Sequence, residues 1–296
     1  NSMADMDGLQ EARNITASPC SRGSRYHLRG CDHLDWGMKN RLARIIKPET
    51  GRTVMLAVDH GYFQGPTSGL EIMEDTLGPL AGYADCLMLT RGILRTSVSP
   101  PVHAPNSLKA SGGQSVLSEL SNENWNVAID DCIRLNAAGM ALSIYVGAPY
   151  EHQTLEAFAD LIDAGYSAGI PVLAVTAVGR DMARDARYLS LSSRIAAEMG
   201  ANIVKTYFCE NFERVTSTCP VPIVMAGGKK LPEIEALTMA YNAVQQGAVG
   251  VDMGRNIFQS DCPVGMIKAV KAVVHFDEKP EKAIKIYEDE KRQAKV

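Results

Sequence analysis

The sequence has no excess of charge of either sign and no long apolar run. Its 296 residues include 30 Lys and Arg against 34 Asp and Glu, a formal net charge of −4. This balance gives no electrostatic basis for a surface that binds nucleic acid or an anionic membrane. No apolar run reaches the roughly 18 residues of a membrane-spanning helix, and no signal-peptide pattern is present. We therefore expect a cytoplasmic protein that binds neither nucleic acid nor membrane.

Paired cysteines and common catalytic motifs are also missing. An odd, scattered set of cysteines without a Cys-x-x-Cys pair is typical of reduced thiols, so we expect no disulfide and no metal site. There is no phosphate-binding Walker loop and no Gly-x-Ser-x-Gly elbow, which disfavours kinase-like and serine-hydrolase chemistry. The seven cysteines are Cys20, Cys31, Cys86, Cys132, Cys209, Cys219 and Cys262.

Eight short runs rich in strand-forming residues alternate with segments of helical periodicity. Repeated strand and helix units with nearly continuous apolar strands predict a parallel sheet covered by helices. Eight units without a glycine fingerprint after the first strand favour a TIM (β/α)8 barrel over an open doubly wound sheet. The predicted strands are 53–58, 85–89, 107–111, 141–146, 172–176, 202–208, 222–226 and 249–253, and the predicted helices are 70–84, 122–137, 153–169, 181–200 and 231–247.

The barrel is expected to form a single domain with an extension at each end. Residues 1–45 are mostly polar and lack sustained periodicity, so we predict an N-terminal arm. The barrel domain is assigned to 46–276. Residues 277–296 are highly charged and predict a C-terminal helical tail with a solvated face.

A lysine interrupts the sixth predicted strand. Lys205 stands in the run Asn-Ile-Val-Lys-Thr-Tyr. An ammonium group is costly to bury unless it is paired or deprotonated, and a free amine attacks carbonyl groups to form a Schiff base. The alternative is a structural lysine that pairs with a carboxylate or reaches solvent. Lys205 is the first candidate for catalysis, because reactive groups of this barrel lie at the carboxyl ends of strands.

An adjacent carboxylate and imidazole, Asp59 and His60, follow the first predicted strand. The two groups suit acid–base catalysis, and the carboxylate is a candidate partner for the lysine ammonium. Neighbouring residues of a strand face opposite ways, so only one points inward unless the chain turns at Asp59. The alternative is a helix-capping residue beside a hydrogen-bonded histidine.

Glycine turns follow the seventh and eighth predicted strands. Gly227 and Gly228 end one strand, and Gly254 precedes Arg255 at the end of the next. Glycine lets a phosphate approach backbone N–H groups, and the last two loops of such barrels commonly bind phosphate. An arginine adds a two-pronged contact. We predict a phosphate site here, although either turn alone is equally compatible with a simple loop. Tyr145, inside the fourth strand, is interpreted as core filling.

These residues resemble the class I aldolase family of the DeoC and archaeal fructose-bisphosphate aldolase type. The resemblance rests on VMLAVDHG, NIVKT, AGGKK and GRNIFQ. More narrowly, residues 28 to about 275 resemble a thiolase branch of this family, which acts on phosphorylated autoinducer-2. The blocks that carry this narrower resemblance are 30–42, 58–71, 90–95, 150–153, 194–207 and 219–233.

The resemblance implies an acyltransferase on a TIM barrel. It would transfer an acetyl group from a phosphorylated diketone to the co-substrate coenzyme A, releasing dihydroxyacetone phosphate, with no bound cofactor. Lys205 would form the Schiff base, Asp59 and His60 would assist it, and the two glycine turns with Arg255 would hold the phosphate. A ring-type homo-oligomer, a decamer, is also implied.

The fifth predicted strand departs from the aldolase pattern. The broader aldolases carry an aromatic-x-Tyr-Pro stretch with a proton-donating tyrosine there, whereas residues 173–177 read LAVTA. This loss fits acyl transfer to a thiolate and leaves the proton transfers unassigned. The alternatives are a true class I aldolase acting on a ketose phosphate and a non-catalytic sugar-phosphate binding protein. No motif marks the coenzyme A site, and the basic residues near Arg91 and Arg95 are a candidate for holding its adenine and phosphates.

Overall fold

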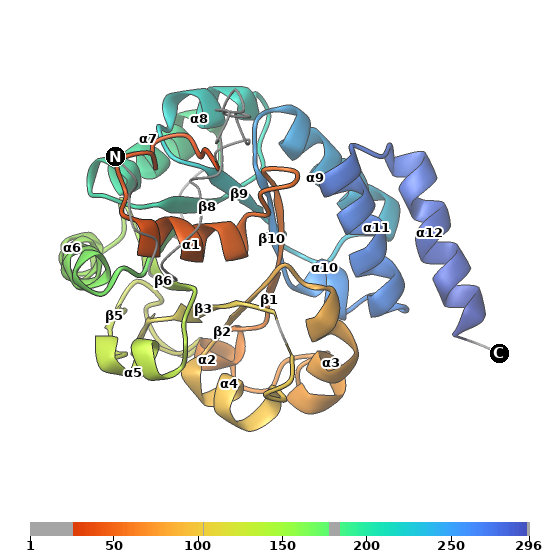
Figure 1. Ribbon diagram of the computed structural model, residues 1–296, viewed down its shortest axis with the longest axis horizontal. Helices are drawn as coiled ribbons and strands as arrows, with labels where there is room; N and C mark the ends of the chain where they lie inside the picture. The colour runs from red at the N-terminus through yellow and green to blue at the C-terminus, as the bar shows by residue number, and fades with distance from the viewer. Residues whose placement is uncertain (1–25, 103, 178–183, 295–296) are drawn as a thin grey trace, which may run out of the picture.

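Eight parallel strands close into a barrel, as the sequence predicted (Figure 1). The computed structural model describes residues 26–102, 104–177 and 184–294. Each strand pairs with the next along the chain, and β10 returns to β1 with Thr53 opposite Gly250. The barrel strands are β1 Thr53–Ala57, β2 Cys86–Leu89, β3 Asn106–Lys109, β6 Gly139–Ile144, β7 Val172–Thr176, β8 Ile203–Tyr207, β9 Ile223–Ala226 and β10 Gly250–Met253.

Helices surround the barrel because each strand has an outward apolar face to cover. The main core cluster lies between strands and helices and includes Val54, Leu87 and Phe158. The helices of the described residues are α1 Trp36–Ile45, α2 Gly61–Gln64, α3 Met73–Leu80, α4 Arg91–Ser97, α5 Ile129–Arg134, α6 Glu151–Ala168, α7 Ala186–Glu198, α8 Phe212–Thr218, α9 Glu233–Gln245, α10 Arg255–Phe258, α11 Pro263–Phe276 and α12 Pro280–Gln293, with a 3-10 turn at Ala81–Tyr83.

Helix α1, Trp36–Ile45, lies across one end of the barrel (Figure 1). Asp35 caps its N-terminus by accepting a hydrogen bond from the backbone N–H of Met38. Met38, Leu42 and Ile45 are buried in a second core cluster. That cluster also contains side chains from the barrel interior, among them Met55, Cys86, Met88, Leu173, Ile203 and Val224. The amino ends of the strands are thus closed by apolar packing, which leaves the carboxyl ends for chemistry.

The predicted helix 122–137 is wrong over its first half. Only Ile129–Arg134 is helical, and β5, Asn124–Trp125, pairs antiparallel with β4, Ser111–Gly112. Glu123 precedes β5 with a fully buried side chain that pairs with Lys109. This polar contact inside the barrel fixes the backbone and overrides the helical periodicity of the segment.

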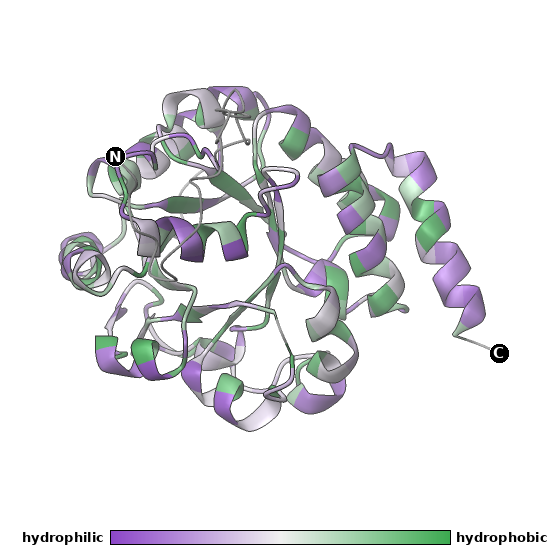
Figure 2. Ribbon diagram, viewed as in Figure 1, coloured by the Kyte–Doolittle hydropathy of each residue, from purple (hydrophilic) through white to green (hydrophobic). Residues whose placement is uncertain are grey.

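The other predicted helices are present with shifted ends. The predicted helix 181–200 corresponds to α7, which begins after the capping residue Asp185, and its residues 181–183 lie outside the described part of the chain. The charged C-terminal segment forms α12, a mostly hydrophilic helix in Figure 2 that buries Ala283 and Tyr287. In the described ranges no helix is long and apolar enough to cross a membrane. Six of the seven cysteines lie within those ranges, all free and buried, and Cys20 lies outside them.

Candidate active site

Lys205 points into the barrel from the middle of β8. Alternate residues of a strand share a face, and Ile203 lies in the interior core cluster, so Lys205 faces inward too. Its Nζ lies 3.7 Å from Met88 Sδ and 2.8 Å from Asp252 Oδ2. The Lys205 side chain is 11% exposed, so its amine is sheltered and still reaches a cavity.

Asp252, on β10, is the carboxylate that pairs with Lys205. The sequence suggested Asp59 for this pairing, which is wrong, because β10 lies two strands from β8 and presents Asp252 inward at the same height. Burial raises the pKa of the Asp252 carboxyl and the Lys205 ammonium opposes that rise. A carboxylate inside an apolar strand run was the signal that could have identified it.

The predicted phosphate-binding residues gather around Lys205. Gly227 and Gly228 follow β9, while Gly254 and Arg255 follow β10. All four line one cavity of about 80 Å³, together with Lys205 itself, and His60 and Asp252 line it as well. The structure therefore brings six of the seven sequence-predicted site residues to one place.

Backbone geometry explains why glycine occupies these turns. Gly228 has a φ of +66°, a conformation that other residues rarely adopt. A Cβ at Gly254 would lie 2.3 Å from the carbonyl oxygen of Ala57 and 2.7 Å from His60 Cε1. The close approach of this turn to the end of β1 thus requires glycine.

Asn256 holds the two turns together from α10. Its amide donates to the carbonyl oxygens of Gly227 at 2.7 Å and Lys229 at 3.0 Å, and its Oδ1 accepts from the N–H of Leu231 at 2.8 Å. Asn256 is fully buried, so these bonds are sheltered from water. One side chain therefore fixes the loop after β9 relative to the loop after β10.

His60 lines the cavity and packs against an aromatic side chain. Its ring packs edge-on against Phe258, with centroids 5.6 Å apart. Burial lowers the pKa of the His60 imidazole; the Asp59 carboxylate opposes this shift, and the charges of Lys205 and Arg255 add to it. Its Nδ1 is buried without a hydrogen-bond partner among the described residues, and so is Nε of Arg255.

Asp59 lies beside this group in a neighbouring, larger cavity. The chain turns after β1, so Asp59 and His60 do not alternate as in a strand. Asp59 lines a cavity of about 600 Å³ that also contacts Tyr62 and Lys109. The charge of Asp59 adds to the raised pKa of Asp252, which places the two carboxylates near each other. Asp59 and His60 therefore border adjoining cavities.

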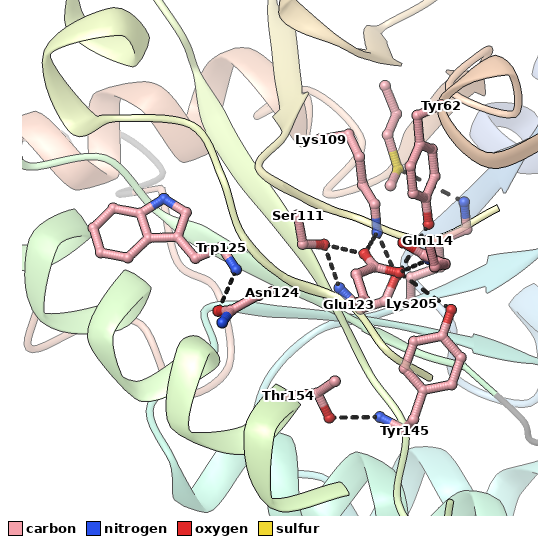
Figure 3. A network of polar contacts seen from close by, with 12 residues as sticks. Tyr62, Lys109, Ser111, Gln114, Glu123, Asn124, Trp125, Tyr145, Thr154 and Lys205 are labelled. Atoms are coloured by element: carbon pink, nitrogen blue, oxygen red, sulfur yellow. Dashed lines mark hydrogen bonds and ion pairs between the residues drawn. The ribbon is translucent and has the colours of Figure 1, made fainter. Parts of the chain in front are cut away.

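A second buried lysine was missed by the sequence analysis. Lys109 Nζ, at the end of β3, lies 2.9 Å from Glu123 Oε1, and both side chains are almost completely buried. Lys109 also donates to the Ser143 hydroxyl, and Glu123 accepts from Ser111 and Gln114. Figure 3 shows the side chains of Lys109, Ser111 and Gln114 converging on the Glu123 carboxylate. The lysine stands in a predicted strand, so the same signal that identified Lys205 was present.

Two tyrosines complete this network. The hydroxyls of Tyr62 and Tyr145 donate to Glu123 Oε2 at 3.1 and 3.2 Å (Figure 3). Burial raises the pKa of both Tyr62 and Tyr145, and the negative charge of Glu123 adds to the effect. Tyr145 is buried as expected, but it also has a specific polar partner that the sequence could not reveal.

Within the ranges described, no group of three or more His, Cys, Asp or Glu side chains could hold a metal ion. Cys209, just past β8, is buried, and burial raises the pKa of its thiol. Its environment is therefore that of an inert thiol.

The chain matches a known protein family over most of the barrel. Residues 53–260 match the family described as DeoC/LacD family aldolase. The chain belongs to the DeoC/LacD aldolase family. This confirms the resemblance inferred from the sequence, and it places Lys205, Asp252 and both glycine turns within the matched segment.

Full-length relatives in this family carry a more specific name. A Salmonella paratyphi A protein named 3-hydroxy-5-phosphonooxypentane-2,4-dione thiolase is 56% identical over 290 residues, covering 98% of this chain and 100% of the relative. An Escherichia coli K12 protein of the same name is 54% identical over 291 residues, again covering 98% and 100%.

Solved aldolase structures share the fold. A Schiff-base-forming fructose-1,6-bisphosphate aldolase superposes with a TM-score of 0.73 at 23% identity, covering 80% of this chain and 99% of that one. A fructose-bisphosphate aldolase from Slackia heliotrinireducens gives 0.75 at 18% identity, covering 86% and 90%. At these identities the likeness concerns the fold.

Proposed function

We propose that the protein is a thiolase that cleaves 3-hydroxy-5-phosphonooxypentane-2,4-dione with coenzyme A, giving acetyl-CoA and dihydroxyacetone phosphate. The observation that carries this proposal is an inward-facing lysine, Lys205, paired with a buried carboxylate and bordered by two glycine turns and an arginine. The full-length relatives of that name support the choice of substrate.

The phosphate of the diketone binds the two glycine turns in this proposal. Gly228 and Gly254 bring the backbone of the two turns to the cavity, and Arg255 lines it too, with a buried Nε that has no partner in the described residues. Anions are stabilised by backbone N–H groups and by guanidinium. Docking there places C4, the carbonyl carbon next to the phosphorylated methylene, against Lys205.

Imine formation then proceeds on Lys205 with Asp252 as proton carrier. The ammonium gives a proton to Asp252, whose pKa is raised by burial, and the free amine adds to C4. Loss of water from the adduct yields a protonated imine. The protonated imine is a sink for electrons released at the neighbouring carbon, C3.

Cleavage follows attack by the thiolate of coenzyme A on the C2 carbonyl. The tetrahedral adduct collapses, the C2–C3 bond breaks, and its electron pair moves into an enamine on C3, C4 and the Lys205 nitrogen. Acetyl-CoA leaves, the enamine takes up a proton at C3, and hydrolysis of the imine returns the amine and dihydroxyacetone phosphate. The water lost in imine formation is regained in imine hydrolysis. The overall reaction is therefore diketone plus coenzyme A giving acetyl-CoA plus dihydroxyacetone phosphate.

Two proton transfers fall to the turn after β1. Asp59 borders the larger cavity and is the base for the thiol, because its carboxylate reaches the side from which a second substrate enters. His60 borders the lysine cavity and, with an imidazole that burial keeps uncharged, takes over the thiol proton from Asp59 and delivers it to C3 of the enamine. A tyrosine on β7 is not required in this scheme.

The direct test supplies purified protein with the diketone and measures acetyl-CoA and dihydroxyacetone phosphate separately. We expect the two products in equal amounts and none without coenzyme A. Cleavage of the diketone or of a ketose phosphate at an unchanged rate without coenzyme A would contradict the proposal and assign the chain to the aldolases. Lys205→Met is the matched inactive control.

We also propose a ring-type homo-oligomer. Large apolar side chains are exposed at Leu117, Trp36 and Phe276, with 93%, 79% and 74% of their surface accessible. Burial of such side chains against a neighbouring subunit is energetically favourable. Sedimentation velocity is expected to give a species near ten subunits, and a monomer would contradict this part.

A further inference from the structure

In the proposed function the phosphate of the diketone lies in the Lys205 cavity, so the larger cavity is left without a role. Its position suits a different ligand. It has a volume of about 600 Å³, within the range of small-molecule sites, and lies over the carboxyl ends of β1, β2 and β3. Asp59 lines it, while the next residue, His60, lines the Lys205 cavity. A molecule in the larger cavity would therefore end within reach of the reacting carbons.

Its walls suit a long, uncharged chain with amide groups. Leu70, Met73, Ile93 and Val127 supply apolar surface. Glycines between these side chains leave backbone groups uncovered. Gly92 on α4 has open space around it, because a Cβ there would have no neighbouring atom closer than 3.9 Å. The pantetheine arm of coenzyme A has this chemistry, with two amides in an otherwise apolar chain.

Three arginines form a positive cluster, of which Arg91 lines this cavity while Arg95 and Arg134 line a separate one. Arg91 lines the cavity, and its guanidinium pairs with Asp131 at 2.9 Å. Arg95 and Arg134 pair with the same carboxylate at 2.6 and 2.7 Å. The three side chains are 41%, 46% and 72% exposed, whereas Asp131 is 7% exposed.

The cluster keeps a net positive charge. Asp131 offsets one of the three guanidinium charges, and the nearby Asp130 acts on Arg134 and offsets at most another. Asp131, with which all three arginines pair, holds the guanidinium groups in place and leaves them partly exposed. Exposed guanidinium groups held in this way bind phosphate.

We propose that the cavity binds the pantetheine arm of coenzyme A, with its thiol at Asp59, and that Arg91, Arg95 and Arg134 bind the phosphates of its nucleotide. This inference rests on the proposed thiolase function. The cofactor-sized cavity, the base at its inner end and the cation cluster at Arg91 together carry it.

The first test separates the phosphates from the arm by comparing coenzyme A with D-pantetheine, which lacks the nucleotide. In the Arg91→Gln/Arg95→Gln variant we expect the KM for coenzyme A to rise about 10- to 100-fold, the loss expected for charge-assisted contacts. The KM for pantetheine should stay within twofold. Arg194→Gln, which removes an exposed i, i+4 pair with Glu198 on α7, is the matched control.

The second test fills the cavity. Gly92→Leu should raise the KM for both thiols at least tenfold, while borohydride trapping of the diketone on Lys205 stays unchanged. Gly82→Leu is its control, because a Cβ at Gly82 has similar room, with no atom within 4 Å, and Gly82 does not line the cavity. Thermal melting of each variant verifies that it is folded.

The outcomes distinguish the two proposals. Acetyl-CoA formation with an unchanged KM for coenzyme A in both the arginine and Gly92→Leu variants would overturn the site and leave the thiolase function intact. A wild-type protein that forms no acetyl-CoA and shows no calorimetric binding of coenzyme A would overturn both.

Discussion

Lys205 and Asp252 form a charge pair in a place where both groups are shielded from water. Taking two charges out of water is costly, and the pair is stable only while both partners are present. For catalysis this arrangement has a second value, because a buried carboxylate with a raised pKa can take the proton that the amine must lose. In the proposed mechanism the pair is therefore both a structural element and the first proton relay.

We predict that Lys205→Met abolishes turnover and destabilises the fold by about 3 kcal/mol, because Asp252 is left as a buried charge without a partner. The double variant Lys205→Met/Asp252→Asn should recover most of that stability and remain inactive. Urea unfolding at pH 7 gives the comparison. Equal unfolding midpoints for the single and double variants would show that the pair is not ionised as described.

His60 provides a prediction on pH dependence. Its pKa lies below the ordinary 6.5, chiefly through burial, so the imidazole is uncharged at neutral pH. Because the folded pKa is the lower one, the stabilisation from the neutral ring is present above the unfolded value and is lost as pH falls through the folded pKa. We expect kcat/KM to be constant down to about pH 6.5 and to fall below it.

A pH–rate profile between pH 4.5 and 9 measures this acidic limb, the decrease of kcat/KM at low pH. In His60→Gln the limb should disappear along with most of the activity, on the order of 100-fold. A wild-type limb centred above pH 7 would be incompatible with a buried, uncharged imidazole.

The two glycine loops work as one element because Asn256 joins them. We predict that Asn256→Ala raises the KM for the phosphorylated diketone about tenfold, because the loop after β9 loses three hydrogen bonds that set its distance from Arg255. Steady-state kinetics with saturating coenzyme A measure the change.

The control is another buried asparagine at the opposite end of the barrel. Asn202 accepts a hydrogen bond from the N–H of Val172 at 2.8 Å, and Asn202→Ala should lower stability while leaving that KM unchanged. If both variants raised the KM equally, a general loosening of the barrel would explain the effect, and the bridging role of Asn256 would be wrong.

The β4–β5 hairpin depends on Glu123. We predict that Glu123→Gln destabilises the protein by about 3 to 5 kcal/mol, because Lys109 is left inside the barrel without its carboxylate. Lys109→Met/Glu123→Gln should cost clearly less than the sum of the single variants. Urea unfolding of all four proteins completes the double-mutant cycle, and strict additivity would contradict a direct pair.

These elements also show what a sequence can and cannot predict. The strands were predictable because their apolar runs reflect burial on both faces, and Lys205 and the glycine turns were predictable because they stand in or directly after such runs. The carboxylates that pair with the buried lysines were not predictable. Whether Asp252 or Asp59 meets Lys205 depends on strand order and register, and Glu123 reaches Lys109 through a hairpin hidden in a helical pattern.

At the scale of the whole molecule, a further buried charge network lies at the amino end of the barrel, opposite the Lys205 cavity. Asp85, just before β2, accepts from the N–H of Val54 at 2.7 Å, from His275 at 2.6 Å and from Lys271 at 3.1 Å. It thus ties β1 and β2 to α11, away from the Lys205 cavity. Burial opposes its ionisation, but the bonds from His275 and Val54 and the charge of Lys271 hold the pKa of Asp85 below its usual value.

We predict that Asp85→Asn lowers stability by about 3 kcal/mol at pH 7 and leaves kcat unchanged in the folded protein. Because the folded pKa is lowered, the stabilisation is present above the unfolded pKa and is lost as pH falls through the folded pKa. The difference between wild type and variant should therefore be constant above about pH 5 and shrink as pH falls below about 4. Urea unfolding across this range measures it, and a constant difference would contradict the role of the charge.

The central claim is that the amine of Lys205 becomes covalently bonded to the diketone. Borohydride reduction in the presence of the diketone, without coenzyme A, followed by peptide mass spectrometry tests it most directly. We expect one stable adduct per chain, located on Lys205 and absent from Lys205→Met. Full turnover in Lys205→Met, or an adduct located on Lys109 instead, would contradict the account.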